Sequence, residues 1–398
     1  MTKIPRLLGV QIQNGFSPEA RVFANLLRHR DQEYEAQVIH QSDTSNPQWA
    51  EMFSAVSNAP QFRLDAGWRP SPIRGKRSLA ARVGSRLRYR MMFPEMLRAA
   101  RAYDPDVLYS CQQVWDITAA TYLAKKLDKP QIVHLHYIIG PWLGKLALER
   151  LKTCDHIVTV SDFIRQEVLD YGIAPERVTT VRNAMSVFPL PMPAQRSKVR
   201  AEWNLPDDTL LVGMAARFDA GKGAEDTIAA FCLAAAKHAS ACLLMIGDGE
   251  LRPALEAQAQ QSGFGERIVF TGRRSDVPDL LAGLDIFCHP SRKDPAPLAV
   301  LEACAAGLPV VGYAEGGICE FLIDGETGLL APTGDVAELG AALDRLLTNT
   351  DIRRRMGIAS RQRIETEFQP KDAGAKLAAI VEEVCAAYAA TQRRDSSR

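Results

Sequence analysis

Short apolar runs alternate with longer amphipathic stretches along most of the chain, and the runs have the length of buried strands. A first series of predicted strands comprises Leu7–Ile12, Ala36–His40, Val107–Ser110, Gln131–His136, His156–Val160 and Val178–Val181. A second series comprises Leu210–Ala215, Ala241–Ile246, Ile268–Thr271, Ile286–His289 and Pro309–Tyr313. Strands separated by helix-length segments predict parallel sheets with helices on both faces, so we expect two doubly wound α/β domains.

A proline-rich segment separates the two series. It reads FPLPMP over Phe188–Pro193, and prolines at alternate positions make a stiff connector without helix. We therefore predict an N-terminal domain over 1–187 and a C-terminal domain over 194–369. A helical pattern follows over Pro370–Thr391, and we expect the tail Arg393–Arg398 to be disordered.

The composition is that of an ordinary globular protein and argues against several classes. With 46% hydrophobic residues, 24% charged residues and a net charge of +1, the chain has no overall attraction to nucleic acid. No apolar window is long enough to span a membrane, and the first apolar run is too short for a signal peptide. The eight cysteines form no CxxC pair and mostly lie in apolar stretches. This argues against a zinc site or redox dithiol and favours a reducing compartment.

The most informative polar residues lie in the C-terminal half. Two carboxylates, Asp294 and Glu302, are separated by seven residues, and a predicted strand and the pair Gly316-Gly317 follow. Asp294-Pro295 has the pattern of a helix start, with Asp as N-cap and Pro at the first helical position. In such a helix the two carboxylates would lie about 12 Å apart along the axis. That separation is too large for one metal ion and suits an extended ligand such as a nucleotide-sugar.

This segment resembles the donor-binding signature of retaining glycosyltransferase family 4, in which a Glu is followed by seven residues and a second Glu. The sequences AxAAGxPVV over 303–311 and GGxxE over 316–320 match the family as well. Two positions depart from the pattern. Asp294 replaces the first Glu, and Ala296-Pro297 replaces a common Phe-Gly pair, so Pro297 has no N–H to offer a phosphate.

The resemblance implies a GT-B fold, with two doubly wound domains facing across a cleft and the segment 370–398 crossing back to the N-terminal domain. It implies a hexosyltransferase that moves a sugar from a UDP- or GDP-sugar to a hydroxyl of a glycan acceptor, with no metal or other cofactor. In that site Glu302 would bind ribose hydroxyls, and Asp294 and His136 would face the sugar. The other implied donor-binding or catalytic positions are Gly15, Arg217, Lys222, Gly247, Arg273, Leu298, Gly316 and Gly317.

Two cations follow the predicted strand Leu210–Ala215. Arg217 and Lys222 match the family's Arg and Lys-Gly positions, and fixed positive charge would stabilise the charge that grows on a departing diphosphate. The loop is not a P-loop, because Ala216 and Gly223 stand where a Walker motif needs Gly and Ser or Thr. A surface loop with ordinary charges is the alternative.

In the N-terminal half, His134 and His136 alternate along one strand and therefore share a face. Both could look into a cleft, or both could be core histidines. Asn14-Gly15 follows the first strand, where family members often carry a Gly pair that lets the backbone approach the donor.

A basic stretch runs from Arg63 to Arg101. Arg82, Arg86 and Arg90 recur at helical spacing beside an apolar face, which predicts a basic amphipathic helix around 74–101. Such a helix could bind an anionic membrane surface and present the site to a lipid-linked acceptor. We expect a cytoplasmic enzyme, peripheral on the inner face of the plasma membrane, in surface polysaccharide assembly. A core-packing helix with a solvated basic face is the alternative.

Retention by double displacement would need a carboxylate beneath the anomeric carbon, and the N-terminal residues named above include none. The resemblance implies instead a front-face reaction in which the departing phosphate accepts the acceptor's proton. Two other functions stay open: a nucleotide-sugar epimerase of the same fold, and a non-catalytic scaffold subunit of a polysaccharide-assembly complex. Asp294, Ala296 and Pro297 are the residues that favour the scaffold.

Overall fold

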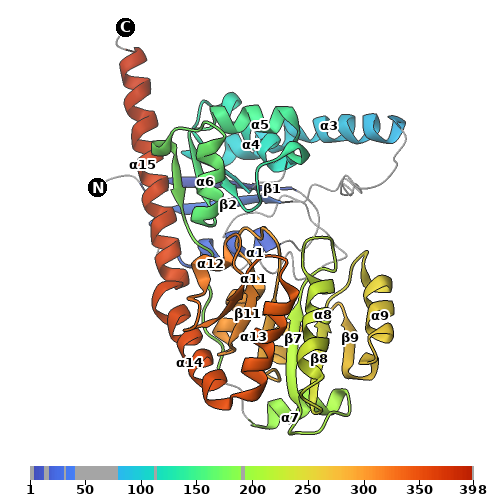
Figure 1. The fold of residues 1–398 in the computed structure, drawn as a ribbon. Coiled ribbons are helices and arrows are strands. Elements are labelled where there is room, and N and C mark those ends of the chain that lie inside the picture. The colour runs from blue at the N-terminus through green and yellow to red at the C-terminus, as the bar shows by residue number, and fades with distance from the viewer. Residues whose placement is uncertain are drawn as a thin grey trace. The chain divides into compact units, whose positions relative to one another are not determined.

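The computed structural model describes residues 4–12, 18–30, 33–40, 79–111, 114–189 and 193–396, and in helix α3 the side chains from Met91 onward. The chain divides into two compact units (Figure 1). Unit 1 comprises Met1–Arg182 and Pro370–Arg398, and unit 2 comprises Asn183–Gln369. The division falls between Arg182 and Asn183, ahead of the proline-rich segment.

Unit 1 contains a parallel sheet of six strands in the order β2-β1-β3-β4-β5-β6. Their bounds are β1 Arg6–Gln11, β2 Glu35–His40, β3 Val107–Cys111, β4 Gln131–Leu135, β5 His156–Thr159 and β6 Val178–Thr180. Each lies within a residue or two of its predicted range. The first series of apolar runs therefore forms one sheet, as expected.

Helices cover both faces of this sheet. They are α1 Pro18–Arg28, α3 Leu79–Tyr103, α4 Val114–Leu127, α5 Gly144–Thr153, α6 Asp162–Asp170 and α15 Pro370–Ser396, with the 3-10 turns η1 Pro141–Leu143 and η2 Pro175–Arg177. On one face, Leu8 and Val10 of β1 pack with Leu123 of α4 in a single apolar cluster. On the other, Phe23 of α1 stacks on Tyr109 of β3 with ring centroids 4.4 Å apart. The alternation of side chains along β1 and β3 thus supplies two separate packing surfaces.

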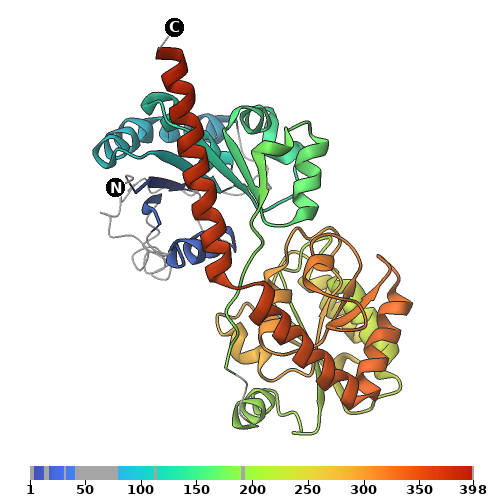
Figure 2. The same ribbon diagram turned by 90° about the vertical axis from the view of Figure 1, so that its left-hand side faces the viewer.

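The last helix, α15, belongs to unit 1 and packs against α1 (Figure 2). Gly374 permits this contact, because a Cβ there would lie 2.2 Å from the carbonyl oxygen of His29. Farther along, the Tyr388 hydroxyl donates to Asp128 at 2.8 Å. The helix continues through Arg393 to Ser396, so the prediction of a disordered tail is wrong for those residues.

The predicted basic helix falls on α3, whose backbone is helical from Leu79 to Tyr103. Residues 74–78 and the side chains of Arg82, Arg86 and Arg90 lie outside the described part of the chain. The predicted basic face of this helix therefore stays a prediction.

Unit 2 contains a second parallel sheet in the order β12-β11-β10-β7-β8-β9. Its strands are β7 Leu210–Ala215, β8 Ala241–Ile246, β9 Ile268–Gly272, β10 Ile286–His289, β11 Val310–Tyr313 and β12 Gly328–Ala331. The predicted series again forms one sheet. Only β12 was not predicted, because four residues that begin with Gly give a weak strand signal.

Helices of unit 2 also lie on both faces of their sheet. They are α7 Pro193–Glu202, α8 Ala224–Ala235, α9 Arg252–Gln261, α10 Val277–Leu281, α11 Leu298–Ala305, α12 Ile318–Phe321, α13 Val336–Thr348 and α14 Thr350–Glu367, with η3 Gly265–Arg267. Phe231 of α8 and Leu343 of α13 are fully buried in the main apolar cluster with Val212 of β7. Helices α11 and α14 pack together elsewhere in the unit. This core holds the strand ends that carry the candidate site.

Candidate functional site

The strand order of unit 2 reverses between β7 and β10, which are neighbours although two strands separate them in sequence. In open α/β sheets ligands bind beyond the carboxyl ends of the strands at such a reversal. Two loops leave the sheet at this point: 216–223 after β7 and 290–297 after β10. They carry Lys222 and Asp294, two of the residues singled out from the sequence.

These two residues form an ion pair. The Lys222 ammonium lies 2.5 Å from Oδ2 of Asp294, whose side chain is only 11% exposed. Ser291 supports the pair, because its hydroxyl lies 3.4 Å from the same Asp294 oxygen and 3.2 Å from the Gly221 carbonyl. The amide of Arg292 also donates to the Gly221 carbonyl at 2.8 Å. The two loops are therefore fastened to each other by backbone and side-chain contacts.

Burial by itself would raise the pKa of the Asp294 carboxyl, but neighbouring His289 and Lys222 outweigh it and hold this pKa well below its usual range. The Nε2 atom of His289 is 3.7 Å from Oδ2 of Asp294, too far for a full hydrogen bond. We therefore assign the lowered pKa chiefly to the Lys222 ammonium. Asp294 is a buried anion at neutral pH.

Arg217 lies on the same loop as Lys222 but has a different environment. Its side chain is 77% exposed, and its guanidinium lies 3.1 Å from the Asp219 carboxylate. The adjacent backbone is fixed, since the amide of Phe218 donates to the carbonyl of Asp248 at 3.0 Å. The structure thus places Lys222 against Asp294 and leaves Arg217 with Asp219.

The helix start predicted at Asp294-Pro295 is wrong. Helix α11 begins at Leu298, and Pro297 stands at its N-cap with φ −67° and ψ 107°. A residue before proline avoids the helical region, so Pro297 keeps Ala296 out of the helix and delays the start. The step of about 12 Å along one axis therefore does not describe Asp294 and Glu302. The helix amides that could bind an anion are therefore those of the first turn from Leu298 onward, and not those after Asp294.

Glu302 lies in the second turn of α11 and is 8% exposed. Leu298, four residues earlier, is partly exposed at the first position of the helix. Residues four apart share a helix face, so Leu298 and Glu302 line one side of α11. This face follows directly from the loop that carries Asp294.

The predicted glycines pack against protein backbone. A Cβ on Gly317 would lie 1.9 Å from the Pro295 carbonyl oxygen, and the Gly317 amide donates to the Asp294 carbonyl at 2.8 Å. A Cβ on Gly316, whose φ is 75°, would lie 2.6 Å from that same Asp294 oxygen. A Cβ on Gly247 would lie 1.9 Å from the carbonyl oxygen of Ala216. Glycine is needed at each position to build the site's loops, whether or not a ligand approaches.

Two predicted residues lie at the ends of β8 and β9. The Gly247 amide donates to the Gly272 carbonyl at 3.0 Å, which joins the two strand ends. Arg273 follows Gly272 and is exposed. Because all six strands are parallel, Gly247, Arg273 and the Lys222–Asp294 pair lie at the same edge of the sheet.

In unit 1, His136 lies directly after β4 and is 8% exposed, while His134 within β4 is fully buried. Their ring centroids are 4.1 Å apart, and Nδ1 of His134 lies 2.5 Å from the Tyr109 hydroxyl. Burial lowers the pKa of His136 to about 3 and the pKa of His134 well below its usual range. Both rings are neutral at pH 7. Gly15 lies outside the described residues.

The sequence interpretation missed His289 and Ser291, which stand beside Asp294. Both lie in the segment His289-Pro290-Ser291 that ends β10. The signal was present, because a His at the carboxyl end of a buried strand in a parallel sheet faces the edge where ligands bind.

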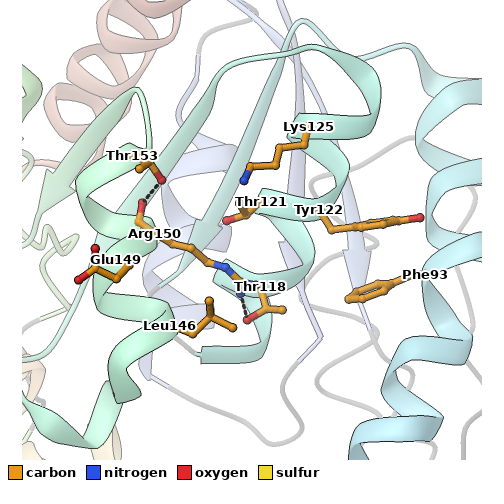
Figure 3. A pocket seen from close by; sticks show the side chains of 9 residues that line it. All are labelled: Phe93, Thr118, Thr121, Tyr122, Lys125, Leu146, Glu149, Arg150 and Thr153. Carbon is orange, nitrogen blue, oxygen red and sulfur yellow. Dashed lines mark hydrogen bonds between the residues drawn. The ribbon is translucent and has the colours of Figure 1, made fainter.

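Unit 1 also has a surface groove of about 390 Å³ between α3, α4 and α5. Figure 3 shows Phe93 and Tyr122 side by side on one wall, and their rings stack with centroids 4.4 Å apart. Arg150 reaches across from α5 and donates to the Thr118 hydroxyl. Leu146 and Lys125 also line the groove. It contains none of the residues predicted for donor binding.

Metal-ligand clusters and membrane-spanning helices are both absent from the described part of the chain. No group of three or more His, Cys, Asp or Glu side chains there is arranged to hold a metal ion. No helix there is both long enough and apolar enough to cross a membrane. All eight cysteines are unpaired, and five are buried.

Two family models match consecutive parts of the chain. One is described as Glycosyltransferase Family 4 and matches residues 20–187, and the other as Glycosyl transferases group 1 and matches residues 195–363. The first match lies in unit 1 apart from its last five residues, 183–187, and the second lies within unit 2.

Named relatives are glycosyltransferases. The chain is 28% identical to glycogen synthase of Mycobacterium tuberculosis over 284 residues, which cover 67% of this chain and 66% of that protein. The chain thus spans just under two thirds of the length of that relative. It is 29% identical over 318 residues to the GDP-mannose-dependent alpha-(1-6)-phosphatidylinositol monomannoside mannosyltransferase of Mycolicibacterium smegmatis, covering 73% of this chain and 81% of that protein.

Solved structures share the fold. HepE of Anabaena, crystallised with UDP and glucose, aligns with a TM-score of 0.79 at 17% identity, covering 95% of this chain and all of HepE. WaaG, described as a glycosyltransferase of lipopolysaccharide biosynthesis, aligns with a TM-score of 0.67 at 16% identity, covering 94% and 99%. These likenesses and the two parallel six-stranded sheets confirm the predicted fold class.

Proposed function

We propose that this chain, a glycosyltransferase with the GT-B fold, moves a sugar with retention of configuration from a UDP- or GDP-sugar to a hydroxyl of a glycan acceptor. The observation that carries the donor assignment is the Lys222–Asp294 pair at the strand reversal of unit 2, beside the first turn of α11. HepE is described with bound UDP-glucose, and the mannosyltransferase of M. smegmatis as GDP-mannose-dependent. Those descriptions support a nucleotide diphosphate sugar as the donor class.

In the proposed complex the diphosphate draws the Lys222 ammonium away from Asp294 and takes the first-turn amides of α11 as further donors. Arg217, exposed on the same loop, adds a second cation by leaving Asp219. Glu302, one turn after Leu298, accepts hydrogen bonds from the ribose hydroxyls. Cationic side chains and helix amides then stabilise the charge that grows on the leaving group, and we propose that no divalent metal takes part.

Neutral His136 would donate or accept a hydrogen bond at the sugar without adding charge, because burial keeps its pKa near 3. Asp294 would hold a sugar hydroxyl. We propose front-face transfer, in which the departing phosphate takes the acceptor's proton. Transfer of this kind needs neither a second carboxylate nor a covalent intermediate.

We further propose a lipid-linked acceptor and a peripheral position on the inner face of the plasma membrane, in surface polysaccharide assembly. Three large apolar side chains of unit 1 support this: Met91 is 72% exposed, Trp142 44% and Leu146 64%. Leu146 lines the groove in Figure 3, together with Lys125 and Arg150. Exposed Trp and Leu with neighbouring cations suit the interface of an anionic membrane.

A thermal-shift screen against UDP, GDP and ADP tests the donor proposal, because a ligand that binds only the folded state raises its melting temperature. We expect one of the three to raise the melting temperature in proportion to the logarithm of its concentration. The absence of any response at millimolar concentration would contradict the donor site. An assay for free nucleoside diphosphate, run with and without acceptor, separates transfer from epimerisation.

A further inference from the structure

His289 is the last residue of β10 and lies behind the Lys222–Asp294 pair. Its side chain is 3% exposed, and its ring lies parallel to that of Phe287, with centroids 6.3 Å apart. Neither ring nitrogen has a hydrogen-bond partner in the part of the chain that the structure describes. Buried polar atoms are almost always paired, so an unpaired imidazole here calls for a partner in another state of the site.

The nearest candidate partner is the Asp294 carboxylate. Nε2 of His289 lies 3.7 Å from Oδ2 of Asp294, about 1 Å beyond a charge-assisted hydrogen bond. Lys222 already donates to that oxygen at 2.5 Å, and the imidazole makes no hydrogen bond to it. The other nearby cation, Arg292, is engaged elsewhere, since its guanidinium lies 2.9 Å from Asp226.

Donor binding would change which group holds the Asp294 carboxylate. If the diphosphate takes Lys222, a carboxylate with a side chain only 11% exposed loses its cation, which is strongly unfavourable unless another donor replaces it. His289 is positioned to be that donor after a shift of about 1 Å. Among the described contacts, Lys222 and Ser291 bind Oδ2 of Asp294 and His289 faces the same atom, so Oδ1 stays available for a sugar hydroxyl.

We infer that His289 is a positioning residue. When the donor's diphosphate binds Lys222, the His289 imidazole donates a hydrogen bond to the Asp294 carboxylate and so keeps Asp294 oriented toward the sugar. The inference rests on the proposed function. It also gives a physical meaning to Asp294 in place of the Glu of the resembling family. An Asp side chain is one methylene shorter than Glu, so its carboxylate stays near the end of β10, within reach of His289.

Steady-state kinetics with the identified nucleotide-sugar test the inference in four variants: His289→Leu, His289→Gln, Asp294→Asn, and Asp294→Asn combined with His289→Leu. Because H289L removes one hydrogen bond to a charged group, we expect kcat/KM to fall about ten- to a hundredfold. Calorimetry should show nucleoside diphosphate binding weaker by about tenfold, because in H289L the diphosphate must take Lys222 from a carboxylate that has no replacement donor. H289Q, whose amide can still donate, should recover most of the activity.

The double variant decides between positioning and a structural effect. If His289 acts through Asp294, H289L should lower activity little further in the D294N background. His238→Leu is the matched control, because it breaks a His–Asp contact of 2.8 Å to Asp344 elsewhere in unit 2. H238L should transfer sugar like wild type.

Additive losses in the double variant, or equal losses for Leu and Gln at position 289, would overturn the role of His289. If wild type transfers sugar and H289L transfers it equally well, only this inference is overturned. Wild type that binds no nucleoside diphosphate would instead contradict the proposed function. Should H289L fail to fold, the same comparison is made with His289→Asn, whose shorter amide cannot reach Asp294.

Discussion

The ammonium of Lys222 lies 2.5 Å from Oδ2 of Asp294, although the two residues are 72 positions apart in sequence. The contact joins the loops that leave β7 and β10, where the strand order of unit 2 reverses. The pair neutralises one of the two cations expected to hold a diphosphate. Donor binding therefore has to compete with Asp294, and this competition makes several outcomes measurable.

Lys222→Ala should abolish sugar transfer, with a loss of about a hundred- to a thousandfold in kcat/KM, because it removes fixed charge at the departing diphosphate. The fold should survive, since the Lys222 side chain is one third exposed. Lys237→Ala is the matched control, as Lys237 forms a similar pair with Asp344 at 2.6 Å on the surface of unit 2. Full activity in K222A would contradict the donor site.

Asp294→Asn should have opposite effects on binding and transfer. Lys222 is then free for the diphosphate, so calorimetry should show UDP or GDP binding tighter by about three- to tenfold, the range of a partly exposed ion pair. Transfer should nevertheless fall, because the sugar loses its carboxylate. Asp344→Asn should change neither quantity. Weaker nucleotide binding in D294N would mean that Asp294 does not compete for Lys222.

Glu302→Ala should abolish transfer and weaken nucleoside diphosphate binding together, since Glu302 is proposed to hold the ribose that donor and product share. A cost in binding of about tenfold or more fits the loss of hydrogen bonds to a charged group. The exposed Glu338→Ala on α13 is the control for loss of a carboxylate in unit 2. If E302A bound UDP or GDP normally, Glu302 would have another role.

The fold was predictable because its signal is local. Most strands in both sheets are short runs of largely buried residues, so the predicted ranges differ from the observed ones by at most two residues, apart from β12. The order of the strands and the pairing of Lys222 with Asp294 depend on contacts between distant segments. The spacing of residues along the sequence does not predict those contacts.

The helix start at Asp294 failed for a local reason that the sequence did contain. Pro295 alone favours a helix start, but Pro297 two residues later restricts Ala296 and moves the start to Leu298. The packing role of Gly317 could not be predicted from the sequence, for a different reason. Its missing side chain makes room for the Pro295 carbonyl, a contact that appears only after the chain has folded.

Acid should destabilise unit 1 through its buried histidines. The pKa of His136 is lowered by burial to about 3, whereas an unfolded His titrates near 6.5. As the pH falls, the unfolded state therefore binds a proton at pH values where folded His136 is still neutral. Stability is fully present above about pH 6.5 and is lost as pH falls toward 3, with a slope of up to about 1.4 kcal/mol per pH unit.

Urea unfolding of wild type and His136→Gln at pH 7, 5.5 and 4.5 measures this slope. The free energy of unfolding of wild type should decrease relative to that of the variant as the pH falls, because Gln does not titrate. Parallel curves would show that His136 is not held neutral in the folded state.

The last prediction concerns two exposed apolar side chains of unit 1. Trp142 and Leu146 lie on successive turns of η1 and α5 and are 44% and 64% exposed. If they enter a membrane interface, wild type should pellet with vesicles that contain anionic lipid. Pelleting should fade as salt screens the basic groups.

Replacing both residues by Ser should weaken vesicle binding by about tenfold or more, because burying each apolar side chain contributes about 1.5–3 kcal/mol at full transfer and less when transfer is partial. Ile358→Ser is the matched control, since Ile358 is a comparably exposed apolar residue, 59%, in unit 2. Equal pelleting with neutral and anionic vesicles would rule out recognition of anionic lipid. If the double variant bound vesicles like wild type, any membrane affinity would belong to another surface. The double variant should fold, because both side chains are exposed.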